Sequence, residues 1–260
     1  MNLFNQHALV CGGSKGIGKA IAIGLAQLGA SVTIAARNAE LLENIIHTLP
    51  KISNEQKHQF LIIDFEQTED VRKKIHLLTL SHPVDILINN TGGPASGLIQ
   101  NAAIEEFTKA FSQHLICNHL ISQICIPYMK EKNHGRIINI ISTSVKQPLD
   151  NLGVSNTVRA AVANWAKTLA NELGEYNITV NNVLPGATRT ERLEALIQKE
   201  SIAKNKSISD IESEMKKSIP LRRFAEPKEI ANAVCFLASP LASYITGINL
   251  PVDGGRTKSL

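Results

Sequence analysis

Short runs of apolar, largely β-branched residues alternate along the chain with stretches whose apolar residues have helical spacing. The runs are HALVCGG, SVTIAAR, HQFLIIDF, VDILINN, GRIINIIS, ITVNNVLP and TGINLPVDGG. Between the first two, Ile17, Ile21, Leu25 and Leu28 recur every three to four residues, as on one face of a helix. Nearly continuous apolar strands are typical of a sheet that is buried on both faces. The alternation therefore predicts an α/β fold with a doubly wound parallel sheet.

One segment interrupts this alternation. Residues Thr188 to Pro220 are polar, charged and helix-prone, and they contain no strand pattern. They lie between the sixth and the last run, and the loops at the carboxyl ends of parallel strands are where ligands bind. We expect residues 188–220 to form a helical insertion that acts as a substrate lid. No repeat and no Pro/Gly/Ser-rich linker divides the chain, so residues 1–260 are expected to form a single domain.

Composition narrows the class of protein. The chain has 260 residues, of which 43% are hydrophobic, enough for one substantial core. No apolar run reaches the ~18 residues that a membrane span needs, and the N-terminus lacks the pattern of a signal peptide. The four cysteines form no C-x-x-C pair, which indicates reduced thiols. We expect a cytoplasmic protein without a membrane partner.

The charged and metal-ligating residues exclude two further classes. The net charge of +4 is mild, and no basic stripe is interleaved with aromatic residues, so nucleic-acid binding is not expected. The histidine pairs His76 and His82, or His114 and His119, lack cysteine or carboxylate residues at ligand spacing, so no metal site is expected. The partner is expected to be a small molecule.

A glycine-rich loop follows the first strand and opens the first helix. In CGGSKGIG, Gly12, Gly16 and Gly18 have the spacing G-x-x-x-G-x-G. Glycines allow a tight turn and a close approach to a pyrophosphate, and the helix N-terminus supplies free N–H groups and a positive dipole end. The strand–loop–helix context indicates a dinucleotide site in a Rossmann fold. The loop residues expected to contact the cofactor are Gly12, Ser14, Lys15, Gly16, Ile17 and Gly18.

The end of the second strand indicates which dinucleotide binds. An acidic residue there would take the ribose 2′-hydroxyl of NAD, whereas an arginine accommodates the 2′-phosphate of NADP. The residue is Arg37, and Lys15 in the glycine loop could add a second positive charge. The sequence therefore predicts NADP(H) rather than NAD(H).

Further motifs extend this pattern to the end of the chain: IIDF, NNTGG, NNVLPGATRT, RFAEPKEIANAVCFLAS and ITGINLPVDGG. With the glycine loop, they resemble the short-chain dehydrogenase/reductase family nearly end to end, and its 3-oxoacyl-carrier-protein reductase type in particular. The resemblance implies oxidoreduction of a ketone or secondary alcohol. It also implies further cofactor contacts from Asp64, Phe65, Asn90, Thr91, Gly92, Pro185, Gly186 and Thr190.

The catalytic positions of that family are altered here. The family uses Ser, Tyr and Lys, usually with an Asn on an earlier helix. Ser142 is in place, but Ser155 stands thirteen residues on, where the tyrosine belongs, and Arg159 replaces the lysine. Counting without gaps places His114 at the asparagine, although Asn118 lies one helical turn further on the same face.

These changes affect the expected chemistry unequally. Serine is a far weaker acid than tyrosine, and arginine keeps its charge but cannot lose a proton. Ser142 can polarise an oxygen, Arg159 can hold the nicotinamide ribose, and His114 or a water chain could carry the proton. Two alternatives remain open: a non-catalytic NADP(H)-binding sensor and, less favoured, a lyase or isomerase on the same scaffold.

The resemblance also implies a homotetramer. In the family, two long helices, here about 104–129 and 152–174, pair across a two-fold axis. The segment LICNHLISQICIPYM is apolar around most of its helix, more than one buried face requires.

Overall fold

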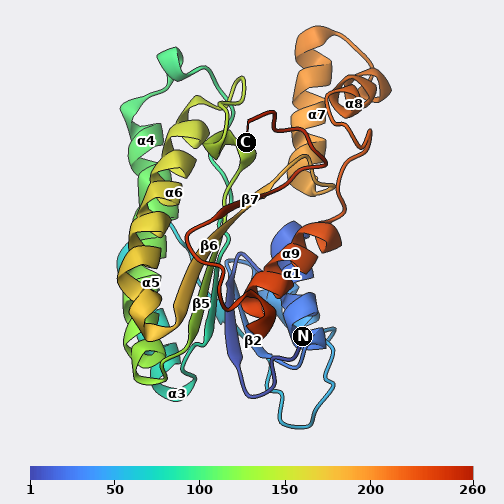
Figure 1. The fold of residues 1–260 in the computed structure, drawn as a ribbon. Helices are drawn as coiled ribbons and strands as arrows, with labels where there is room; N and C mark the ends of the chain where they lie inside the picture. The colour runs from blue at the N-terminus through green and yellow to red at the C-terminus, as the bar shows by residue number, and fades with distance from the viewer. Residues whose placement is uncertain (260) are drawn as a thin grey trace.

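A seven-stranded parallel sheet forms the centre of the computed structural model, which describes residues 1–259 (Figure 1). The strands are β1 (His7–Cys11), β2 (Ser31–Ala36), β3 (Gln59–Ile62), β4 (Ile86–Asn89), β5 (Gly135–Ile140), β6 (Ile178–Pro185) and β7 (Asn249–Val252). Their order across the sheet is β3-β2-β1-β4-β5-β6-β7. Each strand arises from one of the seven apolar runs, and the predicted doubly wound parallel sheet is confirmed. The reversal of strand order between β1 and β4 opens a crevice at the carboxyl ends, where ligands bind in such folds.

Helices cover both faces of this sheet. They are α1 (Gly16–Gln27), α2 (Ala39–Ile46), α3 (Thr68–Ser81), α4 (Ile104–Phe111), α5 (Cys117–Glu131), α6 (Gly153–Leu173), α7 (Glu191–Lys204), α8 (Ile208–Lys217) and α9 (Pro227–Ala238). One face carries α1, α2 and α9, and the other carries α3, α5 and α6. Strands β4 and β5 are buried along their whole length because both faces are covered. In the part of the chain that the structure describes, no helix is long and apolar enough to cross a membrane.

The edge strand β7 contains Pro251, which has no N–H to donate. The hydrogen bonds to β6 show which side each residue faces, because Asn182 of β6 and Gly186, just after β6, donate to the carbonyls of Ile248 and Val252. Alternate residues of a strand bond to the same side, so Pro251 faces the free edge. The proline therefore removes no hydrogen bond from the sheet.

A row of asparagine side chains crosses four strands in register. Asn89, Asn139, Asn182 and Asn249 are direct partners on neighbouring strands. Each of the first three donates its amide N–H to the next side-chain oxygen along the row, at 2.8 Å. Asn89, Asn139 and Asn182 are buried, so these bonds satisfy polar groups inside the core. We call this row the asparagine ladder.

The insertion (residues 188–220) carries α7 and α8 and projects beyond the sheet (Figure 1). Four of its apolar residues, Leu193, Ile197, Ile211 and Ile219, form a small core together with Phe224 of the segment that follows it. The segments on either side of it lie together, because Arg189 donates its N–H to the Ala225 carbonyl and Ala225 donates to the Ala187 carbonyl, both at 2.9 Å. The insertion therefore leaves and re-enters the fold at one place.

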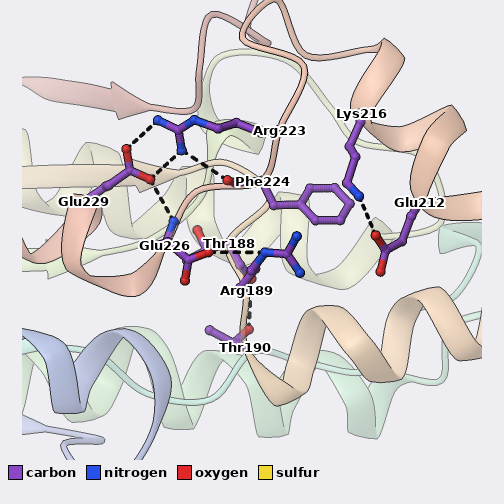
Figure 2. Close-up of polar contacts among 9 residues, drawn as sticks. All are labelled: Thr188, Arg189, Thr190, Glu212, Lys216, Arg223, Phe224, Glu226 and Glu229. Atoms are coloured by element: carbon purple, nitrogen blue, oxygen red, sulfur yellow. Dashed lines mark hydrogen bonds and ion pairs between the residues drawn. The ribbon is translucent and has the colours of Figure 1, made fainter. Parts of the chain in front are cut away.

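Ion pairs fasten this junction to α9 (Figure 2). The guanidinium of Arg223 donates to both carboxylate oxygens of Glu229, at 2.6 and 2.7 Å. Glu229 also accepts the backbone N–H of Glu226, whose own side chain lies 3.2 Å from Arg189. The bidentate pair holds the start of α9 against the segment between the insertion and α9.

The Arg223–Glu229 pair predicts a pH-dependent contribution to stability. The Arg223 guanidinium, and then the Glu226 N–H, lower the pKa of Glu229 from 4.5 to about 2. A carboxyl whose pKa is lower in the folded state stabilises the folded protein at pH values above the pKa of the unfolded state. This contribution is lost as the pH falls through the pKa of the folded state. We expect Glu229→Gln to lower Tm slightly at neutral pH, because the pair is exposed. The Tm difference from the unmodified protein should shrink between pH 4.5 and about 2. Circular dichroism melts of both proteins across this range provide the measurement, and a constant difference would contradict the prediction.

The long helix predicted over 104–129 is interrupted. Residues Ser112–Ile116 form a π-helical turn between α4 and α5. A π-turn inserts an extra residue into the helical repeat and so rotates the side chains that follow. His114 lies in this turn and is fully buried.

Candidate active site

A cavity of about 1040 Å³ opens at the carboxyl ends of the strands, between the sheet and the insertion. Most of the residues predicted to bind a cofactor line it, and they come from three loops. These residues are Gly12, Lys15, Gly16, Ile17 and Gly18 after β1, Asn90, Thr91 and Gly92 after β4, and Pro185, Gly186 and Thr190 after β6. The structure therefore brings together segments that lie up to 178 residues apart (190 − 12) in the sequence.

The glycine loop has the shape that a pyrophosphate requires. Gly12 has a φ of +63°, and a Cβ there would lie 2.0 Å from the carbonyl oxygen of Asn90. A Cβ at Gly18 would lie 2.1 Å from the Gly12 carbonyl oxygen, so helix and loop touch only because both residues are glycine. Helix α1 starts at Gly16 without a side-chain cap, which leaves its first N–H groups free for an anion. These residues fit a bound dinucleotide.

Five predicted residues do not line the cavity: Ser14, Arg37, Asp64, Phe65 and His114. Arg37 follows β2 directly and is exposed, and Asp64 lies just beyond the end of the neighbouring strand β3. Both stand at the edge of the sheet where the adenine end of a dinucleotide is expected. Lys15 lines the cavity, but its Nζ forms an ion pair of 2.8 Å with Glu191 of α7.

The three altered or retained catalytic positions lie together on the cavity wall. Ser142 follows β5, and Ser155 and Arg159 lie one turn apart on α6. The Ser142 oxygen accepts the Ser144 N–H at 3.1 Å, which leaves its own O–H free to donate. Arg159 is only 7% exposed and donates to the Ile140 carbonyl at 3.1 Å. The wall thus presents two hydroxyls and one guanidinium.

His114 lies behind the cavity wall. Its Nδ1 is 2.6 Å from the hydroxyl of Thr91, which does line the cavity, and its buried Nε2 has no hydrogen-bond partner in residues 1–259. Burial, and then the charges of Arg159 and Arg192, lower the pKa of His114 to about 2. The imidazole is therefore neutral at physiological pH and can reach the cavity only through the Thr91 hydroxyl.

No tyrosine among residues 1–259 lines this cavity. Tyr128 lies near the end of α5 and Tyr176 just after α6, and Tyr244 is fully exposed before β7. The cavity therefore contains no substitute for the phenol that Ser155 replaces.

Sequence reasoning missed a set of contacts between α7 and the loop after β4. Arg192 donates to the carbonyls of Gly93 and Pro94 at 2.8 and 3.0 Å. Lys199 donates to the Ser96 hydroxyl at 2.8 Å. Both cations line the cavity, yet in the sequence they look like ordinary residues of a polar helix. The only signal was the polar character of the insertion as a whole.

Comparisons with known proteins agree with this architecture. The family model described as Enoyl-(Acyl carrier protein) reductase matches residues 12–257. The NADPH-dependent reductase BacG of Bacillus subtilis (strain 168) is 33% identical over 264 residues, which cover 98% of this chain and 99% of BacG. The L-sorbose reductase of Gluconobacter frateurii, solved with NADPH and L-sorbose, superposes with a TM-score of 0.92 at 29% identity, covering 100% of this chain and 99% of that one.

A solved short-chain dehydrogenase/reductase family protein is 30% identical, with a TM-score of 0.84 and coverage of 98% of this chain and 99% of that one. Sequence motifs, strand order and cavity position thus agree with relatives matched over their full length. The chain belongs to the short-chain dehydrogenase/reductase family of oxidoreductases.

Proposed function

We propose that this protein is an NADP(H)-dependent reductase of a ketone, or a dehydrogenase of the corresponding secondary alcohol, that works without the family's tyrosine. The observation that carries the proposal is the joint placement of Ser142, Ser155 and Arg159 on one cavity with the glycine loop. A protein that only recognised the adenine end of the cofactor would not need this wall. BacG is an NADPH-dependent reductase and the sorbose reductase was solved with NADPH bound, and both support the same cofactor here.

The residues of the wall suit stabilisation of an oxyanion. The bound cofactor would supply or accept the hydride. Ser142 would donate its free O–H to the reacting oxygen, and the fixed charge of Arg159 would stabilise the negative charge that develops there. Arginine has five N–H donors, so Arg159 could bond the Ile140 carbonyl, the nicotinamide ribose and the oxygen together.

The proton must then reach that oxygen by another route than a tyrosine. Ser155 has a hydroxyl at the cavity, but serine is too weak an acid to give up its proton without a relay. Neutral His114 cannot act as an imidazolium, although it bonds the Thr91 hydroxyl on the wall. We favour a water chain that ends on the Ser155 hydroxyl. The participation of His114 in this relay stays a prediction.

A panel of ketones, 2-oxo acids and secondary alcohols tests the proposal. The purified protein should oxidise NADPH with at least one carbonyl compound, at a rate proportional to protein concentration. Ser142→Ala should reduce kcat by about 10²–10³-fold, as expected for loss of an oxyanion donor. Its matched control is Ser144→Ala, which removes the neighbouring hydroxyl that does not line the cavity. Tight NADPH binding without turnover would contradict the proposal.

That outcome would favour the second candidate, a non-catalytic sensor whose cofactor occupancy controls a partner. The absence of any tyrosine from the cavity lining of residues 1–259 is the observation in its favour. The sensor would bind NADPH and leave every substrate of the panel unchanged.

The cofactor preference depends on Arg37. Arg37 is exposed at the end of β2, and no carboxylate pairs with it in residues 1–259. We expect NADPH to bind more tightly than NADH, and Arg37→Asp to lose about tenfold to a hundredfold in NADPH affinity by removing charge-assisted bonds to the 2′-phosphate. Titration of protein fluorescence with each cofactor measures the ratio. Equal affinities of the unmodified protein for both cofactors would refute this assignment.

We further propose that the protein is cytoplasmic and homotetrameric. Four free, buried cysteines fit a reducing compartment. Ile104 is 78% exposed and Ile116 50% exposed, on the α4–α5 stretch expected to pair with a second subunit. Light scattering at micromolar concentration should report four times the mass of the chain, and a monomer would refute the assembly.

A further inference from the structure

The guanidinium of Arg159 is a buried positive charge without a counter-charge. It is 7% exposed, and its hydrogen bond of 3.1 Å goes to the neutral carbonyl of Ile140. No carboxylate among residues 1–259 lies within ion-pair distance of it. Burial, and then the charge of Arg192, lower the pKa of Arg159 to about 10, so it stays charged at neutral pH. An uncompensated buried charge is costly, and proteins normally pair it.

A second cation of the cavity is also uncompensated. Arg192 donates to the carbonyls of Gly93 and Pro94, neither of which carries a charge. Its field reaches the deeper residues, because it lowers the pKa values of Arg159 and His114. The two arginines thus give this part of the cavity a positive potential that attracts anions.

The carboxylates that line the cavity do not neutralise this charge. Glu191 pairs with Lys15 and Glu200 pairs with Lys204, at 2.8 and 3.0 Å. Asp150 is exposed in the loop before α6, where water screens it. The cavity therefore has positive charge beside Ser155, from Arg159 and Arg192, that no carboxylate of its lining neutralises.

The cofactor phosphates do not provide the missing charge either. A pyrophosphate is expected at the start of α1, which packs on the face of the sheet opposite to α6 (Figure 1). Arg159 belongs to α6 and lies beside Ser142 at the end of β5, where the reacting end of the cofactor is expected. The nicotinamide ribose that Arg159 is proposed to bond is neutral, so the missing negative charge is left to the substrate.

We propose that the substrate of this reductase is an anion, whose carboxylate pairs with Arg159 in the space that Ser155 leaves by being smaller than the tyrosine. This inference rests on the proposed function, and it names 2-oxo or 3-oxo carboxylates as the substrate class. A carboxylate matches the guanidinium fork in two parallel hydrogen bonds, which lysine could not provide. This pairing would explain why an arginine, and not the family's lysine, stands at position 159.

Binding of a matched pair of probes to the NADPH-saturated protein tests the inference. 4-Phenylbutanoate carries the charge, and 4-phenylbutanamide has nearly the same shape without it. Isothermal titration should give at least about tenfold tighter binding of the carboxylate, the value of one additional charge-assisted bond. In Arg159→Gln most of the preference should be lost, leaving only the smaller part that the charge of Arg192 provides. Arg159→Lys should retain part of the preference, because it keeps the charge and loses the fork.

Two further variants separate the local pairing from general charge effects. Lys57→Gln removes an exposed positive charge outside the cavity and should leave the probe ratio unchanged. Arg192→Gln changes an exposed residue of α7. It should lower the ratio without abolishing it, and it tests the effect of this charge even if Arg159→Gln fails to fold. Equal binding of the two probes to the unmodified protein overturns the inference. So does a preference of undiminished size in an Arg159→Gln variant that still binds NADPH.

Turnover assays distinguish failure of this inference from failure of the proposed function. If 2-oxo-4-phenylbutanoate is reduced faster than its ethyl ester, and the difference depends on Arg159, both are supported. If neutral ketones are reduced and carboxylates show no advantage, the anionic class is wrong and the reductase stands. If carboxylates bind through Arg159 but no carbonyl is reduced, the anion site stands and the reductase is wrong.

Discussion

Replacing Ser155 by Tyr together with Arg159 by Lys is expected to raise the rate of NADPH-dependent reduction of simple activated ketones by ~10²–10⁴-fold. General acid catalysis is typically worth this factor, and no tyrosine now lines the cavity in residues 1–259. Ser142 and the glycine loop remain, so only proton donation and its tuning are restored. A lysine near the new phenol would lower its pKa, as a neighbouring cation does.

A matched double variant isolates the phenol hydroxyl. Ser155→Phe with Arg159→Lys adds nearly the same bulk and the same lysine but no acid, so it should gain nothing. Both variants are compared by NADPH absorbance after their folding and cofactor affinity are checked, because a larger side chain can strain a closed pocket. Equal rates for the two double variants would contradict the prediction. So would no gain in a Tyr/Lys variant that folds and binds NADPH.

The largest expected loss of stability comes from the asparagine ladder. Asn139→Ala removes the acceptor of the Asn89 amide and the donor to Asn182 in one step. Both partners are buried and would be left unpaired, at a cost of about 1–3 kcal/mol each. We expect the free energy of unfolding to fall by about 2–6 kcal/mol.

Urea denaturation followed by circular dichroism measures this loss. Asn44→Ala, on the exposed face of α2, is the control and should change the free energy of unfolding by less than about 0.5 kcal/mol. If Asn139→Ala costs no more than this control, the ladder does not stabilise the sheet. The m-value should stay constant, because the loss concerns the native state.

Most of the fold was accessible from the sequence because burial on both faces leaves a simple signal. Strands β4 and β5 lie between two helical layers, and their residues read as continuous apolar runs. The glycine loop could also be recognised from the sequence, because only glycine permits the close approach of Gly12 to Asn90. Both signals arise from sterics and burial at single positions.

The rest depended on contacts between distant segments. A π-helical turn of five residues is too short to change the spacing of apolar residues in the sequence. His114 therefore could not be placed behind Thr91 from its position in the sequence alone. The hydrogen bond from Arg192 to the Gly93 carbonyl joins residues 99 positions apart. The sequence around neither residue indicates this contact. Helical spacing placed Arg159 one turn from Ser155, but it could not show that the guanidinium lacks a counter-charge.

The two hydrogen bonds that join Ala187, Arg189 and Ala225 make the insertion a structural unit that could be exchanged as a whole. Because its ends meet, the cost of closing the loop varies only slowly with its length. Its apolar residues pack mainly on one another, and Arg192 and Lys199 bond the loop after β4 and not the strands, so a different insertion could be joined at the same place without disturbing the sheet. Members of the family could differ in this insertion alone. Chimaeras joined at Ala187 and Ala225 would then test new insertions, and with them new substrates, on an unchanged cofactor-binding domain.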